Sequence, residues 1–349
     1  MKKSIGNVGQ IGVLHNHEGI GARNYNDEFS SLFTVGENPP RKNVKVLDCT
    51  LRDGGLVNDS RFSVEFARGV LSACDAAGVD IVEIGFRNDD KFFARNAFGA
   101  FRFCDEDFIK PLVEGVRAKI AVLADAGKCD ARKFPNCSES AVDLVRCAFY
   151  ARDISAALET LSIAKQKGYE TAACMMAASS IGAELRGNVR RIAESDAVDI
   201  VYLMDSYGAL LPRQFSAIAR EYAEICAECG KTFGVHAHNN LQCALANELA
   251  GIDAGARVAD CTIGGLGKGA GNCPSELLVS VLRGAKNALP IIDFCQKQVE
   301  PIKTQFHCGQ FPQYMLTAAE NLHPRPAMDF FKNGDTRDIF AFYDGLKRL

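Results

Sequence analysis

Two histidines, His236 and His238, are separated by a single residue in the segment FGVHAHNNLQCALANELAGIDAGA, residues 233–256. They raise the question of a metal site. They close an apolar run, and residues two apart on a β-strand point to the same face. The same spacing occurs at His15 and His17, where no strand is expected, so the spacing alone is weak evidence for a metal site. The alternative is a pair of packed core side chains. The decision depends on whether the fold brings a carboxylate to the same place.

Eight short runs rich in Val, Ile and Cys recur from residue 44 onward. The expected strands are residues 44–50, 79–86, 118–124, 144–150, 170–177, 198–206, 232–239 and 258–265. Segments of helical periodicity lie between them, and several end on a glycine, which favours a helix C-cap. Eight strand–helix repeats predict an α/β protein of the (β/α)₈ TIM-barrel type. An open doubly wound sheet is the alternative, but TLRDGG after the first run is not a dinucleotide fingerprint.

A closed barrel makes the eighth strand the neighbour of the first, and its active site lies at the carboxyl ends of the strands. Arg52 and Asp53 follow the first strand, and Asn272 follows the eighth in GGLGKGAGN. We therefore predict a metal centre made by Asp53, His236, His238 and Asn272. Imidazole, carboxylate and amide ligands suit Mn²⁺, Mg²⁺, Fe²⁺, Co²⁺ or Zn²⁺, and the lack of thiolate favours a harder, six-coordinate ion.

Arg52 beside such a metal fits chemistry on a 2-oxo acid. The acid chelates the ion through its keto oxygen and carboxylate, and an enolate develops when a neighbouring carbon–carbon bond breaks or forms. The metal stabilises that charge as a Lewis acid, and a guanidinium adds a second cationic donor. The alternative for Arg52 is a structural ion pair with a carboxylate such as Glu83.

Four other polar residues at the expected mouth have weaker predictions. Ser206 could bind a substrate carboxylate or cap a helix, and Asn239 could reach the site. Asn240 is expected to be the N-cap of the helix after the seventh strand. Asp48, inside the first strand, is expected to support the site rather than to bind the metal.

Composition and charge narrow the class of protein. The chain has 349 residues and a net charge of −3 without a long basic run, so nucleic-acid binding has little support. No apolar run reaches ~18 residues and no signal peptide is visible, so we expect no membrane span and a cytoplasmic location. The 14 scattered cysteines indicate buried thiols, and the Cys226–Cys229 pair is interpreted as structural.

Three regions differ in character along the chain. Residues 1–43 lack periodicity and are expected to form an N-terminal extension that ends near Pro39–Pro40. Residues 44–290 carry the strand–helix rhythm of the barrel domain. Residues 291–349 have a helical pattern with aromatics and are expected to form a small appendage over the barrel mouth or against a partner.

At this point three ordered motifs carry a family resemblance. LDCTLRDGG (47–55), VHAHNNLQCALAN (235–247) and GLGKGAGNCPSELL (265–278) resemble the DRE-TIM metallolyase superfamily, which includes 4-hydroxy-2-oxovalerate aldolase, hydroxymethylglutaryl-CoA lyase, isopropylmalate synthase and homocitrate synthase. The aldolase-like branch looks closest. The resemblance covers about residues 44–290, and it implies a divalent metal, with Mn²⁺ or Mg²⁺ favoured and Co²⁺ or Zn²⁺ as alternatives. It also implies an enolate-stabilising role for Arg52.

Leu56 is a departure from the aldolase pattern, in which a histidine at this place is the proposed general base. Leucine cannot move a proton. The family's tail brings a tyrosine over the mouth, so Tyr314 and His323 become candidates for proton transfer, and a metal-bound water is a third option.

The resulting prediction is a metal-dependent carbon–carbon lyase that joins or separates pyruvate and an aldehyde, with 4-hydroxy-2-oxo acids as the substrate class. A Claisen-type synthase acting on an acyl-CoA and a 2-oxo acid is an alternative, although no coenzyme A site is visible. A catalytically altered, partner-dependent homologue is a second alternative. We expect a homodimer, and the resemblance implies an aldehyde-processing dehydrogenase as a partner.

Overall fold

Eight parallel strands form a closed barrel in the computed structural model, which describes residues 43–348. The strands are β1 Lys45–Asp48, β2 Ile81–Phe86, β3 Lys119–Asp125, β4 Leu144–Phe149, β5 Glu170–Met175, β6 Ile200–Asp205, β7 Thr232–Ala237 and β8 Val258–Cys261. They pair in chain order, and β8 pairs with β1 through the register Leu47↔Asp260. The predicted TIM barrel is therefore confirmed, and the strands lie within their expected runs except for β3, which extends one residue further, to Asp125.

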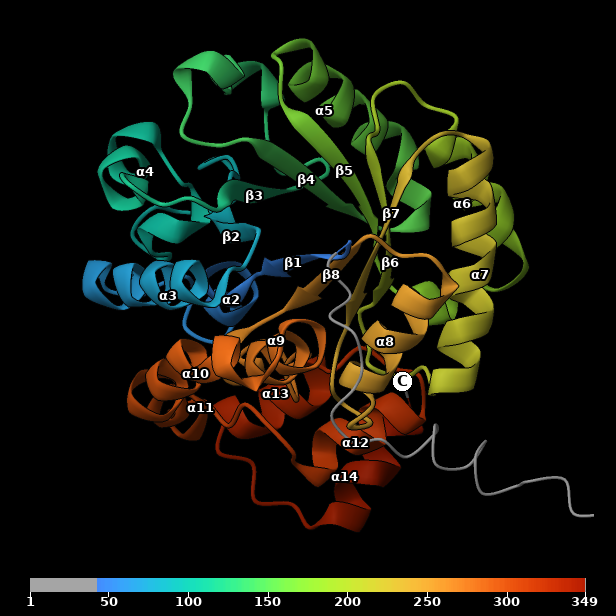
Figure 1. Ribbon diagram of the computed structural model, residues 1–349. Helices are drawn as coiled ribbons and strands as arrows, with labels where there is room; N and C mark the ends of the chain where they lie inside the picture. Colours follow the sequence, from blue (N-terminus) through green and yellow to red (C-terminus); the bar gives the residue numbers. More distant parts are fainter. Residues whose placement is uncertain (1–42, 349) are drawn as a thin grey trace, which may run out of the picture. The chain divides into compact units, whose positions relative to one another are not determined.

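Helices follow the strands and surround the barrel (Figure 1). In the barrel region they are α2 Thr50–Asp53, α3 Val64–Ala77, α4 Glu106–Val113, α5 Ile154–Gln166, α6 Leu185–Ala193, α7 Pro212–Glu228, α8 Ala244–Ala254 and α9 Ser275–Arg283. The C-terminal segment adds α10 Ala285–Phe294, α11 Glu300–Gln305, α12 Pro312–Ala319, α13 Arg325–Lys332 and α14 Ile339–Leu346. Ser63 caps α3, and Gly78 ends it in the left-handed conformation that glycine adopts at little cost.

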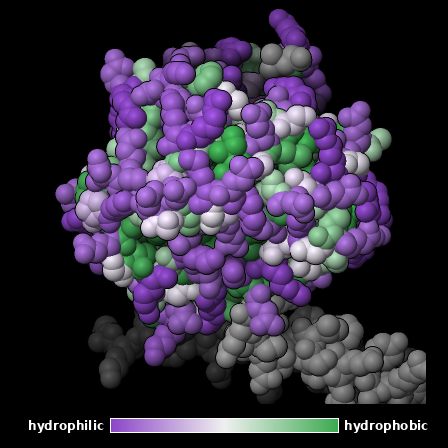
Figure 2. Space-filling model, turned by 90° about the horizontal axis from the view of Figure 1, so that it is seen from above, coloured by the Kyte–Doolittle hydropathy of each residue, from purple (hydrophilic) through white to green (hydrophobic). Residues whose placement is uncertain are grey.

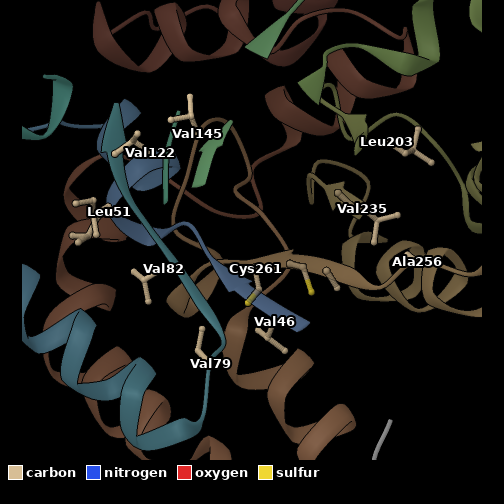
Figure 3. Packing of buried hydrophobic residues seen from close by; sticks show 14 of the residues in the cluster. Val46, Leu51, Val79, Val82, Val122, Val145, Leu203, Val235, Ala256 and Cys261 are labelled. Carbon is tan, nitrogen blue, oxygen red and sulfur yellow. The ribbon is translucent and has the colours of Figure 1, made fainter. Parts of the chain in front are cut away.

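Alternation along the strands divides the core into two layers. One set of side chains, which includes Val46, Val82 and Val235, packs outward between the barrel and the helices (Figure 3). The other set, which includes Leu47, Leu123 and Ile200, fills the barrel interior. Residues at alternate positions on a strand share a face, so a charged side chain in register with the second set must lie inside the barrel.

The C-terminal helices extend this core rather than forming a detached arm. Helix α10 packs against α9 and α3, and a separate apolar cluster joins Tyr314, Phe342 and Leu346 to Ala270 in the loop after β8. Hydrophilic side chains predominate on the face of Figure 2, and hydrophobic ones form small, scattered groups there. The expected boundary at residue 290 falls inside α10, and the division into domains stays a prediction.

The expected N-terminal extension, with His15 and His17, lies outside the described residues except for Asn43. Within residues 43–348, no helix is both long enough and apolar enough to cross a membrane. All 14 cysteines fall in this range and are free thiols, including Cys226 and Cys229.

Candidate metal centre and active site

The two histidines lie at the carboxyl end of β7, a strand labelled in Figure 1. His236 Nδ1 lies 3.0 Å from Asp260 Oδ2, and His238 Nδ1 lies 3.1 Å from the carbonyl oxygen of Gly271. A carbonyl or ionised carboxylate only accepts, so the Nδ1 atom of each ring donates. Burial lowers the pKa of His238 well below its ordinary value, so the Nε2 of that ring carries a lone pair. The Nε2 atoms of the two rings are 3.4 Å apart in a buried site. Two ring nitrogens this close together in a buried site are suited to bind one cation.

Asp53 supplies the carboxylate for this pair. Its oxygen and the ring nitrogens of His236 and His238 all lie within 4.8 Å of one another. Burial alone would raise the pKa of Asp53, but Arg52 and the two histidines together hold it well below its usual range. The carboxylate is therefore ionised and available as a ligand.

Asn272 completes the set from the loop after β8. Its Nδ2 donates to Asp53 Oδ1 at 3.0 Å, while its buried Oδ1 has no hydrogen-bond partner among the described residues. Buried polar atoms are normally paired, so an unpartnered oxygen beside a histidine pair fits a metal ligand. Gly267 makes this approach feasible, since a Cβ there would overlap the Asn272 amide and the Asp53 carboxylate.

A buried ionic network lies beneath the ligands, inside the barrel. Arg146 pairs with Asp260 and with Glu83, at 3.1 Å from the latter, and its guanidinium stacks 4.2 Å from the Tyr202 ring centroid. Although burial opposes it, Arg146 and His236 keep the pKa of Asp260 below its ordinary value. The ionised Asp260 orients the His236 ring, as a carboxylate commonly does for a metal-binding imidazole.

Arg52 joins this network from the other side. Its Nε lies 2.5 Å from Glu83 and its Nη1 pairs with Asp53, so the ion pair with Glu83 that the sequence left open is present. Its Nη2 is buried and has no partner among the described residues. Arg52 is thus fixed by two carboxylates while one donor is left for another ligand.

Cys49 offers a second grouping with His236 and Asp260 at metal-binding separation. However, Cys49 Sγ donates to the carbonyl oxygen of Cys261, and Asp260 is engaged by Arg146 and by the ring of His236. Burial also raises the pKa of Cys49 well above its ordinary value, so the thiol stays protonated. The site that fits a divalent cation is the one formed by Asp53, His236, His238 and Asn272.

Three of the residues with weaker sequence predictions form hydrogen bonds within the protein. Ser206 Oγ accepts a hydrogen bond from the backbone of Ala177 at 3.0 Å, which ties the loops after β5 and β6. Asp48 accepts from the Ser275 hydroxyl, as its expected supporting role requires. Asn239 Oδ1 accepts from the Ala244 N–H at 3.1 Å, so its side chain serves the start of α8.

The expectation that Asn240 caps that helix is wrong. The N-cap position of α8 belongs to Cys243, because a turn separates the strand from the helix. Asn240 is instead buried, and neither atom of its amide has a partner within residues 43–348.

A cleft of about 1300 Å³ lies between the barrel loops and the C-terminal helices, and Lys268 on its wall belongs to the same loop as Asn272. Leu56, Lys268, Tyr314, His323 and Arg325 are among the residues that line it. Burial raises the pKa of the Tyr314 phenol, and burial together with nearby cations lowers the pKa of His323 to about 3. Both tail residues proposed from the sequence therefore reach the cleft.

Sequence reasoning missed Arg146 and Asp260, and it overlooked Lys268 and Arg325. The signal for the first two was present, since each interrupts an otherwise apolar strand at a position that the alternation places inside the barrel. Arg325 gave no comparable signal, because only the tertiary fold brings α13 to the loop after β8.

Comparisons with known proteins agree with this geometry. A family model described as HMGL-like matches residues 43–303. A curated 4-hydroxy-2-oxovalerate aldolase from Thermus thermophilus is 33% identical over 238 residues, which cover 68% of each chain. Another, from Carboxydothermus hydrogenoformans, is 31% identical over 325 residues and covers 88% of this chain and 94% of its own.

A solved structure supports the fold alone. The N-terminal domain of a protein from Bacteroides vulgatus aligns with a TM-score of 0.72 at 24% identity, over 83% of this chain and 97% of that one.

Proposed function

Because the chain belongs to the HMGL-like family of DRE-TIM metallolyases, as its three motifs predicted, we propose that it is a divalent-metal-dependent aldolase. Its curated relatives are carbon–carbon lyases, so the predicted enzyme class is confirmed at the level of the family. The reaction that we assign is cleavage of the C3–C4 bond of a 4-hydroxy-2-oxo acid to pyruvate and an aldehyde, or the reverse addition. The observation that carries the proposal is the buried histidine pair, whose Nε2 atoms lie 3.4 Å apart and whose ring nitrogens come within 4.8 Å of the Asp53 carboxylate.

The proposed ligands are Asp53, His236, His238 and Asn272, with Mn²⁺ or Mg²⁺ as the preferred ion. When bound, the ion supplies a Lewis acid for the keto oxygen of the substrate. Arg52 donates its unpartnered Nη2–H to the oxygen that becomes negative as the enolate forms. Since Glu83 and Asp53 fix its guanidinium in advance, no reorganisation is needed when the charge develops.

Proton transfer falls to the tail residues because Leu56 carries no titratable group. The raised pKa of Tyr314 keeps its phenol protonated at neutral pH. His323 is neutral there, and its Nδ1 accepts the Arg325 N–H at 2.9 Å, so its proton resides on Nε2. We assign protonation of the aldehyde oxygen during addition to Tyr314, while the His323 Nε2–H donates to another part of the substrate and the proton lost from the pyruvate methyl group passes to water.

The test has two independent readouts. Metal content is measured by mass spectrometry on the wild type, on Asp53→Ala and on His236→Ala, with His307→Ala as a matched histidine control. Proton NMR then follows deuterium exchange into the methyl group of pyruvate with Mn²⁺ present. We expect a stoichiometric ion and exchange in the wild type and in His307→Ala, and loss of both in the two ligand variants. A wild type that stays metal-free after Mn²⁺ loading overturns the proposal.

Leu56 favours a second candidate, a homologue that completes its chemistry only with a partner. Such a protein binds the metal and shows no exchange alone, but gains exchange when an aldehyde dehydrogenase encoded beside it is added. Exchange by the isolated chain excludes this alternative.

A further inference from the structure

Two cations in the cleft have no acidic partner. Lys268 lies in the glycine-rich loop after β8, and Arg325 begins α13 on the opposite wall. Among residues 43–348, neither the Lys268 ammonium nor the Arg325 guanidinium forms an ion pair, although both line the same cleft. Two other cations of the cleft do have acidic partners, since Arg61 pairs with Asp59 and Lys297 with Asp293.

Lys268 and Arg325 are near enough to repel each other. Gly269, the residue after Lys268, lies against Pro324, the residue before Arg325, since a Cβ at Gly269 would come 3.3 Å from the Pro324 Cβ. Asp53 attracts Lys268, but its carboxylate is paired with Arg52 and receives the backbone N–H of Lys268 at 3.1 Å. Like charges held together without a counter-ion destabilise the empty cleft, and an anion between them would remove this penalty.

His323 and Asn240 add neutral donors at the same corner. His323 is affected electrostatically by both Lys268 and Arg325, and its Nε2 carries the proton that is left to donate. The amide of Asn240 is buried without a partner and lies against Gly269, the residue after Lys268. Two cations and two neutral donors thus surround one corner, and no acid among the described residues pairs with the cations.

The cleft also has room for more than a five-carbon substrate. Its volume of about 1300 Å³ exceeds the roughly 300–1,000 Å³ typical of pockets for drug-sized ligands. A substrate that occupies only the metal centre would not reach Lys268 and Arg325. A substrate with a longer aldehyde portion would place its far end between these two cations.

We propose that Lys268 and Arg325, assisted by His323 and Asn240, form an anion subsite that selects an aldehyde with a carboxylate or phosphate at its far end. The substrate class then narrows to 4-hydroxy-2-oxo acids that carry a second anionic group. This inference rests on the proposed function for the aldehyde, but the binding of the anion does not depend on turnover.

Aldol addition to pyruvate is measured with matched aldehydes: succinic semialdehyde against butyraldehyde, and glyceraldehyde 3-phosphate against glyceraldehyde. We expect kcat/KM for one anionic member to exceed that of its neutral match by at least about tenfold, as charge-assisted hydrogen bonds provide. Lys268→Gln and Arg325→Gln should each reduce that ratio by about tenfold. Lys297→Gln, which changes a paired lysine of the same cleft, should leave the ratio unchanged.

Calorimetry with non-reacting probes measures the same preference without chemistry. Glutarate is compared with butyrate, and 3-phosphoglycerate with glycerate, and the better dianion identifies the anionic group. Equal binding within both pairs overturns the subsite, whatever the outcome of pyruvate exchange. A dianion preference that survives both substitutions in folded variants also overturns it. Loss of pyruvate exchange with the dianion preference retained refutes the aldolase and leaves the subsite supported.

Discussion

Asp260→Asn tests whether the ionic network inside the barrel sets the affinity of the metal centre. Asp260 Oδ2 receives the His236 Nδ1–H at 3.0 Å, and the same carboxylate pairs with Arg146. Asparagine keeps an oxygen that accepts from the ring but removes the charge that increases the basicity of Nε2. The ring stays oriented while its strength as a ligand falls.

The expected loss in metal affinity follows from that contact. Removing a partner that orients a metal-binding histidine costs about 10- to 100-fold, or about 1.4–2.7 kcal/mol. Folding stability also falls, because a buried arginine loses one of its two carboxylates. Breaking a buried pair costs about 3–5 kcal/mol, and we expect the lower end since Glu83 still contacts Arg146 at 3.1 Å.

The assay is competition between the apoprotein and a Mn²⁺ chelator, together with urea unfolding of the same samples. Asp199→Asn is the matched control, because Asp199 pairs with Lys165 just before β6, at the end of the barrel away from the site. The control should lose some stability and no metal affinity. If folded Asp260→Asn binds Mn²⁺ as tightly as the wild type, the charge of Asp260 does not tune the centre and the reasoning fails.

Two further predictions concern Leu56 and Asp205. Leu56→His should keep the metal, because Leu56 packs beside the site and is not one of the proposed ligands. The new histidine should speed deuterium exchange into pyruvate if the wild type lacks a base. Loss of the metal in this variant would contradict the placement of the loop that carries Leu56. Burial raises the pKa of Asp205 from 3.8 to about 7, so its stabilising protonated form is fully present below pH 3.8 and is lost as pH rises through 7. The stability of the wild type relative to Asp205→Asn should therefore fall between pH 4 and 8, by up to about 4 kcal/mol in urea unfolding, and a flat difference would contradict the shift.

Local patterns predicted the barrel well because the strands are short and mostly apolar, and because several of the helices between them have their own stop signals. The apolar run before His236 and the glycine that ends α3 are examples of such signals, and both are read within a few residues. The proximity of Asp53 and Asn272 followed once the barrel was closed, because closure makes β8 the neighbour of β1.

Other features of the site depend on contacts between residues that are far apart in the sequence. Asn240 was misassigned because the chain makes a turn before α8, and polar residues suit a turn as well as a cap. The partners of Arg146 come from β2 and β8, so its role required the register of the whole barrel. The cluster of Lys268 with Arg325 depends on where the tail docks, which helical periodicity does not specify.

Closure of the barrel also determines when the site can exist. Asp53 and Asn272 are joined by a hydrogen bond although 219 residues separate them in the chain. During synthesis, a chain that ends before β8 holds the two histidines but lacks the strand and loop that bring Asp53 and Asn272 to them. High-affinity metal capture is therefore a late event that reports complete folding, and the ion would stabilise only the closed molecule. The first and last strands of the barrel are thus held together by the same residues that would hold the ion.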